Sequence, residues 1–146
     1  MLGVHAGVLL KSDVTAGRIE GVKVHNCILV AVQTGIRAES VLELNVMQNH
    51  INCGSTGIVA TNADQCFFQG NLIYHNSGQG RGIWINGKNK IATSHVVTGN
   101  IIAGVRVRPT ALSFDPNPSQ TCVVVAVRWC SLTSRGKSSF ARIGCM

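Results

Sequence analysis

The chain has 146 residues, a length at which one domain with a sizeable core is expected. Its formal net charge is +7. Only 5% of the residues are aromatic, too few for a base-stacking platform, and no segment reaches the roughly 18 apolar residues of a membrane-spanning helix. Neither a nucleic-acid partner nor a membrane span is therefore expected. Valine and isoleucine number 18 and 12 against 9 leucines, which favours strands over helices.

Residues 1–34 are predicted to form an imperfect first turn of a repeating fold. The phrase Gly7-Val8-Leu9-Leu10 matches a Gly-Ile phrase that returns later, and Asn26-Cys27-Ile28 is interpreted as the first Asn-x-Ile phrase. In that alignment Lys23 occupies a position that is apolar in later repeats. The apolar start of the chain lacks a basic region and a clear cleavage site, so it is predicted to belong to the fold and not to a signal peptide.

Residues 35–107 carry the regular repeats. The Gly-Ile phrase begins at Gly35, Gly57, Gly82 and Gly104, in steps of 22, 25 and 22 residues. An Asn-x-Ile phrase returns at Asn49, Asn71 and Asn100. A period in the twenties indicates a solenoid, with three short strands in each rung. Asparagine tolerates the left-handed backbone of a sharp turn, and its amide can bond to an identical residue in the next rung, so we expect an asparagine ladder.

The main alternative at this period is the leucine-rich repeat, whose phrase resembles residues 41–51. The excess of valine and isoleucine and the recurring Gly-Ile strand argue against it. The segments that follow each asparagine are also too rich in glycine and asparagine to form helices. A β-solenoid is therefore the favoured fold.

Residues 108–146 break the pattern. Pro109, Pro116 and Pro118 fall within ten residues, and neither repeat phrase follows them. We predict β-helix rungs over residues 1–107 and a cap or irregular tail over residues 108–146 that does not continue the solenoid. Residues 101–146 carry six lysines and arginines against one acid, whereas residues 1–100 carry seven against five, so positive charge is concentrated near the C-terminal end.

The Asn-x-Ile and Gly-Ile phrases resemble the repeats of right-handed parallel β-helices, as found in pectate-lyase-like enzymes, phage tailspikes, mannuronan epimerases and NosD-type periplasmic proteins. The resemblance covers about residues 7–107. It implies an all-β, right-handed parallel β-helix of about four to five rungs, here a fragment or a reduced solenoid. It also implies carbohydrate chemistry on a polysaccharide and an extracellular or periplasmic location. Calcium is implied by the resemblance alone, and no other cofactor is expected.

Strand alternation predicts which side chains point outward. If Ile36, Ile58 and Ile83 point inward, the residues that follow them point to solvent. Stacking of the rungs then places these outward residues in columns, with successive members about 4.8 Å apart. One predicted outward column is Arg37, Val59, Trp84 and Arg106, and its neighbour is Glu39, Thr61, Asn86 and Arg108. An exposed indole beside cationic and amide groups suits an acidic sugar. The predicted substrate-binding residues are Trp84, Arg37, Asn86, Arg81, Lys88, Lys90, Arg106 and Arg108.

The sequence is less informative about catalysis. Glu39 is the best-placed acid, but a glycosidase needs two carboxylates about 5–10 Å apart, and no obvious pair is present. Arg37 or Arg106 could act as the base of a lyase. The six cysteines form no C-x-x-C pair, and His25 and His50 lie on opposite sides of their asparagines, so no metal site is expected. Cys66 occupies an apolar slot of the repeat and is predicted to be a small buried hydrophobe.

Two functional hypotheses remain open. The first is a β-helix that binds or processes an acidic polysaccharide as part of a lyase, hydrolase or epimerase. The second is a non-catalytic structural or glycan-binding solenoid. An acid cluster on the outward columns would favour the first, whereas the sequence places mainly basic and aromatic groups there.

Overall fold

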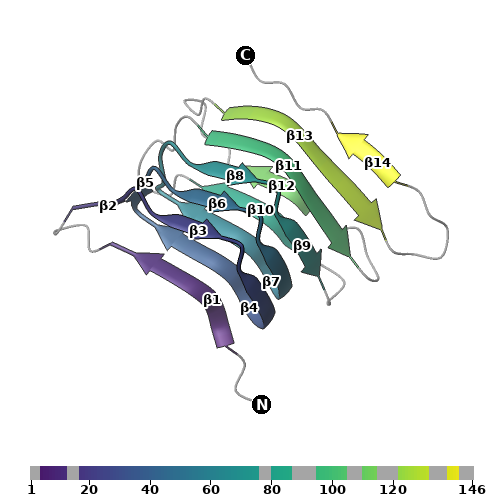
Figure 1. Ribbon diagram of the computed structural model, residues 1–146, viewed down its shortest axis with the longest axis horizontal. Helices are drawn as coiled ribbons and strands as arrows, with labels where there is room; N and C mark the ends of the chain where they lie inside the picture. Colours follow the sequence, from purple (N-terminus) through teal and green to yellow (C-terminus); the bar gives the residue numbers. More distant parts are fainter. Residues whose placement is uncertain are drawn as a thin grey trace.

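The computed structural model describes residues 4–12, 17–75, 80–86, 95–104, 110–114, 122–131 and 138–141. These residues form strands and turns and contain no helix (Figure 1). The strands are β1 (Val4–Lys11), β2 (Ile19–Glu20), β3 (Lys23–His25), β4 (Ile28–Glu39), β5 (Val41–Leu42), β6 (Asn45–Met47), β7 (His50–Thr61), β8 (Phe67–Gln69), β9 (Leu72–His75), β10 (Arg81–Asn86), β11 (His95–Gly104), β12 (Thr110–Phe114), β13 (Cys122–Ser131) and β14 (Ser138–Ala141).

The strands stack as successive turns of a coil. On one face β1, β4, β7, β10 and β12 pair in that order, and on another β3, β6, β8 and β11 do so. Each of these pairings is parallel, and Figure 1 shows the strands lying side by side along the length of the molecule. β4 and β7 are long because each runs around a corner from one face to the next. This is the predicted right-handed parallel β-helix.

The core runs along the axis of this coil. Ile36, Ile58 and Ile83 are in register on adjacent strands and each is 0% exposed, which confirms that this column points inward. A second inward column contains Val46 and Phe68, also fully buried. Because inward positions recur once per rung, each β-branched or aromatic side chain packs on its counterpart above and below.

The asparagine ladder is present and buried. Asn49, Asn71 and Asn100 are at most 1% exposed. The Asn49 side-chain amide donates to Oδ1 of Asn71 at 3.0 Å, and the Asn71 amide donates to Oδ1 of Asn100 at 2.9 Å. Each side chain also donates to a backbone carbonyl of the preceding rung, on β3, β6 and β8 respectively. The ladder therefore satisfies buried polar groups at the same corner of three rungs.

Two details of the predicted turns are wrong. The left-handed residue is not the ladder asparagine but the one before it, since Gln48, Gly70 and Gly99 have φ of 55°, 62° and 63°. The first rung is also displaced by one residue, because Val24 pairs with Val46. Cys27 consequently stands below Asn49 and donates its backbone N–H to Oδ1 of Asn49 at 3.0 Å, whereas Asn26 occupies the left-handed position.

Glycine in the Gly-Ile phrase permits close packing of adjacent rungs. A Cβ on Gly57 would lie 2.5 Å from Cγ2 of Ile73 and 2.7 Å from the carbonyl oxygen of Gly82. Gly35 meets Ile51 and the carbonyl of Gly57 in the same way. The recurring glycine is therefore explained by a steric requirement where the chain enters the Gly-Ile strand.

Parallel stacking continues beyond residue 107. β12 pairs in parallel with β10, and β13 pairs in parallel with β11, with two register shifts. Among the described strands, only β14 pairs in antiparallel fashion, with β13. The expectation that residues 108–146 do not continue the solenoid is therefore wrong for β12 and β13, because strand pairing tolerates the loss of both repeat phrases. The division of the chain at residue 107 stays a prediction.

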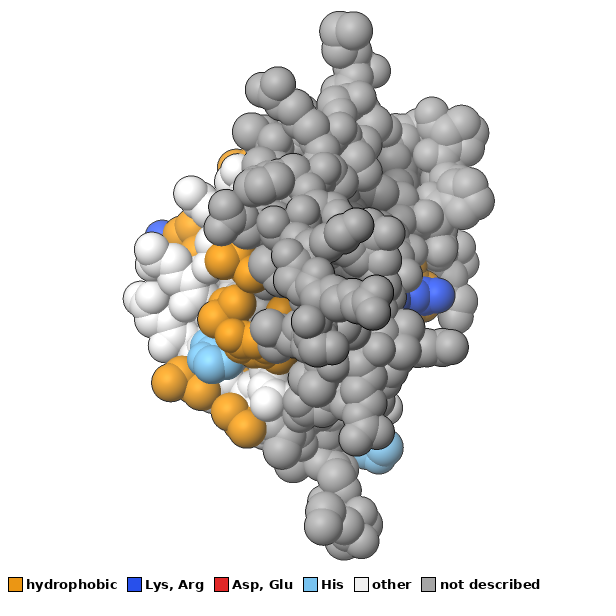
Figure 2. Space-filling view, turned by 90° about the vertical axis from the view of Figure 1, so that its right-hand side faces the viewer, with side chains coloured by type: hydrophobic (Ala, Val, Ile, Leu, Met, Phe, Trp, Pro, Cys, Tyr) orange, Lys and Arg blue, Asp and Glu red, His pale blue; other side chains and the backbone are white. Residues whose placement is uncertain are grey.

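The outward faces of the coil differ in character. On the face formed by β9 and the first parts of β4 and β7, Ile28 is 72% and Val30 58% exposed, and the rings of His50 and Tyr74 lie 5.3 Å apart. Figure 2 views the molecule from the right-hand side of Figure 1 and shows hydrophobic side chains gathered beside a histidine. The face formed by the Gly-Ile strands carries most of the polar groups described next.

Candidate functional site

Two columns cross the Gly-Ile strands in the predicted register, but Val59 and Asn86 in them are only 8% and 6% exposed. Arg37, Val59 and Trp84 are in register on β4, β7 and β10, and so are Glu39, Thr61 and Asn86. β1 extends the columns by one rung, because Leu9 pairs with Arg37 and Lys11 pairs with Glu39. Lys88, Lys90, Arg106 and Arg108 lie outside the described residues.

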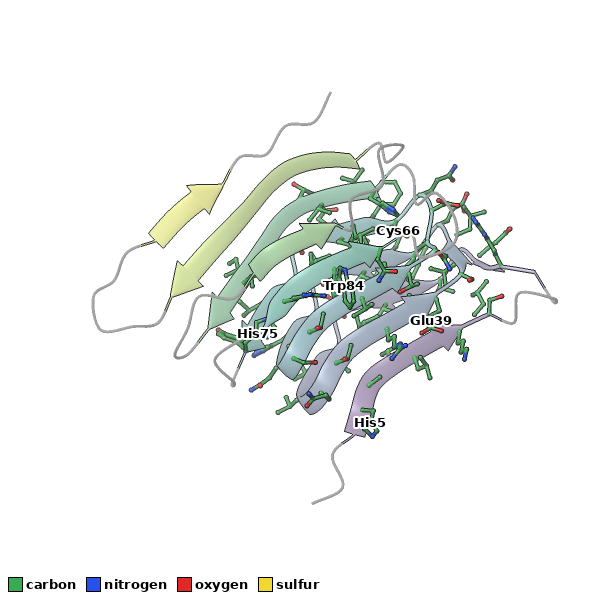
Figure 3. The ribbon with its side chains drawn as sticks, turned by 180° about the vertical axis from the view of Figure 1, so that it is seen from behind. His5, Glu39, Cys66, His75 and Trp84 are labelled. Atoms are coloured by element: carbon green, nitrogen blue, oxygen red, sulfur yellow. The ribbon has the colours of Figure 1, made fainter. Side chains whose placement is uncertain are left out.

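These columns border a pocket of about 530 Å³, which we call the Trp84 pocket. Figure 3 shows Trp84 and Glu39 on the same side of the molecule, on strands β10 and β4, between which β7 lies. Most of the residues that line the Trp84 pocket have polar side chains; the lining residues are Lys11, Ser12, Thr34, Arg37, Glu39, Ser40, Ser55, Thr56, Val59, Thr61, Asn62, Trp84 and Asn86. The pocket lies on a parallel sheet and reaches β1, β4, β7 and β10, so an extended ligand could cross several rungs.

Lys11 was not among the predicted binding residues. It is exposed and lines the pocket one rung before Glu39. The signal was present in the sequence, because Lys11 follows Gly7 by four residues as Glu39 follows Gly35. The degenerate phrase of the first rung concealed this equivalence.

Arg37 and Glu39 form an ion pair inside the pocket. Nε of Arg37 lies 2.8 Å from Oε1 of Glu39, and the Nη2 distance to the same oxygen is 2.6 Å. The Arg37 side chain is 55% exposed and that of Glu39 23%. Two residues apart on one strand, they point to the same face. The pair occupies one carboxylate oxygen and leaves part of the guanidinium open to solvent.

Trp84 is held by Arg81. The guanidinium carbon of Arg81 lies over the indole ring, 4.2 Å from its centroid, within the range of a cation–π contact. The indole Nε1 is buried and has no hydrogen-bond partner. The predicted picture of a freely exposed indole flanked by cations is therefore incomplete. Trp84 is half-buried, and one face of its ring is occupied by a cation.

More cationic than acidic side chains line the Trp84 pocket. Glu39 is the single carboxylate among the described residues that line it. Asp64 is ion-paired with Arg18 at another corner, where its backbone bridges to Leu42. The pair of carboxylates that glycoside hydrolysis uses is therefore not assembled by the described lining residues. What the arrangement can do is attract and hold an anionic or hydroxyl-rich ligand.

The buried cysteines are protonated thiols. Cys66 is 0% exposed, which confirms the predicted apolar slot, and burial raises its pKa to about 12. Burial likewise raises the pKa of Cys53 to about 12. Cys53 and His75 stack on adjacent rungs with Sγ and Nδ1 3.5 Å apart, and burial lowers the pKa of His75. Sequence spacing did not reveal this pair, because its members are one rung, or 22 residues, apart.

The chain matches the protein family described as the right-handed beta helix region over residues 3–127, and it therefore belongs to that family. No curated protein and no solved structure shows a significant match. Among the described residues, no helix is long and apolar enough to cross a membrane.

Proposed function

We propose that this β-helix protein binds an acidic polysaccharide across the Trp84 pocket. The observation that carries the proposal is that Lys11, Arg37 and Trp84 line one pocket on a parallel sheet, while Arg81 lies over the Trp84 indole. Uronate carboxylates would be attracted by these cations, while the partly exposed Ser55 and Thr61 of the lining would offer partners to sugar hydroxyls. The extracellular or periplasmic location that the family resemblance implies is compatible with such a ligand.

Binding without catalysis is the better supported form of this function. The candidate catalytic acid, Glu39, and one candidate base, Arg37, are ion-paired with each other. Arg106, the other candidate base, lies outside the described residues. A structural or glycan-binding solenoid of the same family is the alternative, and it differs from the first proposal in needing no preference for acidic sugars.

Titration calorimetry with an oligogalacturonate at low ionic strength tests the proposal. Binding should weaken as salt rises, because exposed charges are screened. Trp84→Ala should cost on the order of 1–2 kcal/mol of binding through lost aromatic contact. The matched pair Lys11→Ala and Lys23→Ala removes one exposed lysine each, but only Lys11 lines the pocket. Equal effects of these two changes, or equal binding of a neutral oligosaccharide, would contradict the proposal.

A further inference from the structure

The first rung leaves one end of the hydrophobic core partly exposed. Six apolar side chains pack against the core without being fully buried, and all lie in the first rung: Val8, Leu10, Ile19, Val22, Cys27 and Leu29. Four of them pair with residues of the next rung that are 0% exposed, namely Ile36, Ala38, Val41 and Ile51. Inward positions in successive rungs are equivalent, so the first-rung side chains differ in lacking cover on their N-terminal side among the described residues.

The outer edge of β1 presents backbone groups that can pair with another strand. Among the described strands, β1 pairs only with β4. The Ser12 N–H donates to the Glu39 carbonyl, and successive residues of a strand direct their backbone groups to opposite sides. The even-numbered residues of β1 therefore bond to β4, whereas Gly7, Leu9 and Lys11 direct their N–H and C=O groups away from it.

β1 lacks most of the features that keep edge strands from pairing. Such edges are usually short, or they carry proline, a bulge or an inward-pointing charge. β1 has eight residues and no proline, and its inward-facing Ala6, Val8 and Leu10 are uncharged. Its only lysine, arginine or acid is Lys11, the last residue of the strand. An extended strand is therefore the kind of partner that this edge fits.

The opposite end of the coil limits how a second copy of the chain can meet this edge. There the edge of β13 is covered by β14, which runs antiparallel to it. Head-to-tail stacking of two copies would need the edge of β13, which β14 already occupies. Two β1 strands can instead pair with each other, and an antiparallel arrangement places the two Lys11 side chains at opposite ends of the pair. Parallel pairing would set these like charges side by side, which is unfavourable.

We propose that β1 pairs in antiparallel fashion with β1 of a second copy, so that two coils join at their N-terminal ends in a two-fold symmetric dimer. Backbone groups of Gly7 and Leu9 would bond across the axis, and the half-buried apolar side chains of one first rung would cover those of the other. A two-fold contact uses the same surface on both copies and closes after two, so the assembly stops at the dimer.

Sedimentation equilibrium of the full 146-residue chain tests the dimer, and the wild-type protein should fit a reversible monomer–dimer equilibrium. Leu9→Pro removes a donor from the outer edge without breaking a bond to β4, and should raise the dimer Kd about 10-fold or more, because symmetry removes that donor twice. Leu9→Thr is the matched control, since it also removes the 58% exposed leucine side chain but keeps the N–H, and it should raise Kd less than about 3-fold. A monomer at all concentrations up to about 1 mM, an open-ended polymer, or equal effects of the two variants would overturn the proposal.

Amide hydrogen exchange in the wild-type protein is a second measurement, which does not depend on the folding of any variant. The amides of Gly7 and Leu9 should exchange about 10-fold more slowly where the dimer predominates than after dilution below its Kd. The amides of Val8 and Leu10, which bond to β4 in either state, should change less. Unchanged exchange at Gly7 and Leu9, or a change of the same size at Val8 and Leu10, would overturn the proposal. Because neither measurement involves polysaccharide, failure of the dimer and failure of the Trp84 pocket are distinguishable.

Discussion

The side-chain nitrogen of Asn49 lies 3.0 Å from the side-chain oxygen of Asn71, and both residues are buried. The same oxygen also accepts from the backbone N–H of Asn49 at 3.1 Å. One carboxamide thus joins two rungs through side chain and main chain together. Each asparagine of the ladder is consequently a structural requirement of the rung below it.

Replacing the middle member of the ladder should be costly. Asn71→Leu removes the acceptor for the Asn49 backbone and the donor to the Val46 carbonyl, and both groups would remain buried. We expect a loss of roughly 2–4 kcal/mol in the free energy of unfolding, measured by urea denaturation. Asn26→Gly is the control, because Asn26 is exposed and its φ of 53° suits glycine. Similar costs for the two changes would mean that the ladder contributes no stability.

Replacing the glycine of the Gly-Ile phrase even by alanine should destabilise the fold. In Gly57→Ala the new methyl would clash with Ile73 and with the fixed carbonyl of Gly82. We expect a loss of about 2–3 kcal/mol, seen as a lower Tm. Gly21→Asn is the comparison, since Gly21 has φ of 66° with no atom within 4 Å of the added Cβ, and asparagine tolerates that conformation. A neutral Gly57→Ala would contradict the close approach of the rungs.

Acid should destabilise the fold through His95. Burial lowers the pKa of His95 to about 4, against a smaller opposing effect of Asp64. Below its ordinary pKa of 6.5 the unfolded chain binds a proton that the folded chain excludes, so stability falls as pH falls from about 6.5 towards 4. The loss from pH 7 to 4.5 should be on the order of 2–3 kcal/mol.

His95→Leu supplies the control for this pH effect. Leu44 is 0% exposed at the equivalent position two rungs away, so leucine suits the site. Denaturant titrations of the variant should show less dependence on pH than those of the wild-type protein. Parallel pH profiles would show that His95 exchanges its proton equally in the folded and unfolded chains.

Neutralising the acid of the Trp84 pocket should improve binding if that pocket takes polyanions. Glu39→Gln frees the Arg37 guanidinium from its carboxylate partner and makes the pocket more positive by one charge. We expect a few-fold gain in oligogalacturonate affinity at low salt, on the order of 0.5–1 kcal/mol, the scale of an exposed ion pair. Calorimetry measures it. A loss of affinity would instead indicate that Glu39 contacts the ligand.

The sequence alone determined the architecture. Its Gly-Ile phrase marks positions where adjacent rungs leave no space for a Cβ, and its Asn-x-Ile phrase marks the buried ladder, so both are visible as a period. Strand alternation also placed Arg37 and Trp84 in one outward column. These features are readable because every rung repeats the same local requirement.

Only the tertiary structure decided how neighbouring rungs are aligned and what their side chains touch. A displacement of one residue put Cys27, and not Asn26, below the ladder, and strand pairing extended the coil through β12 and β13 without either phrase. The contacts between Arg81 and Trp84 and between Cys53 and His75 were also hidden. The physical reason is that a period fixes which positions are equivalent, whereas rotamers and contacts depend on atoms a whole rung away.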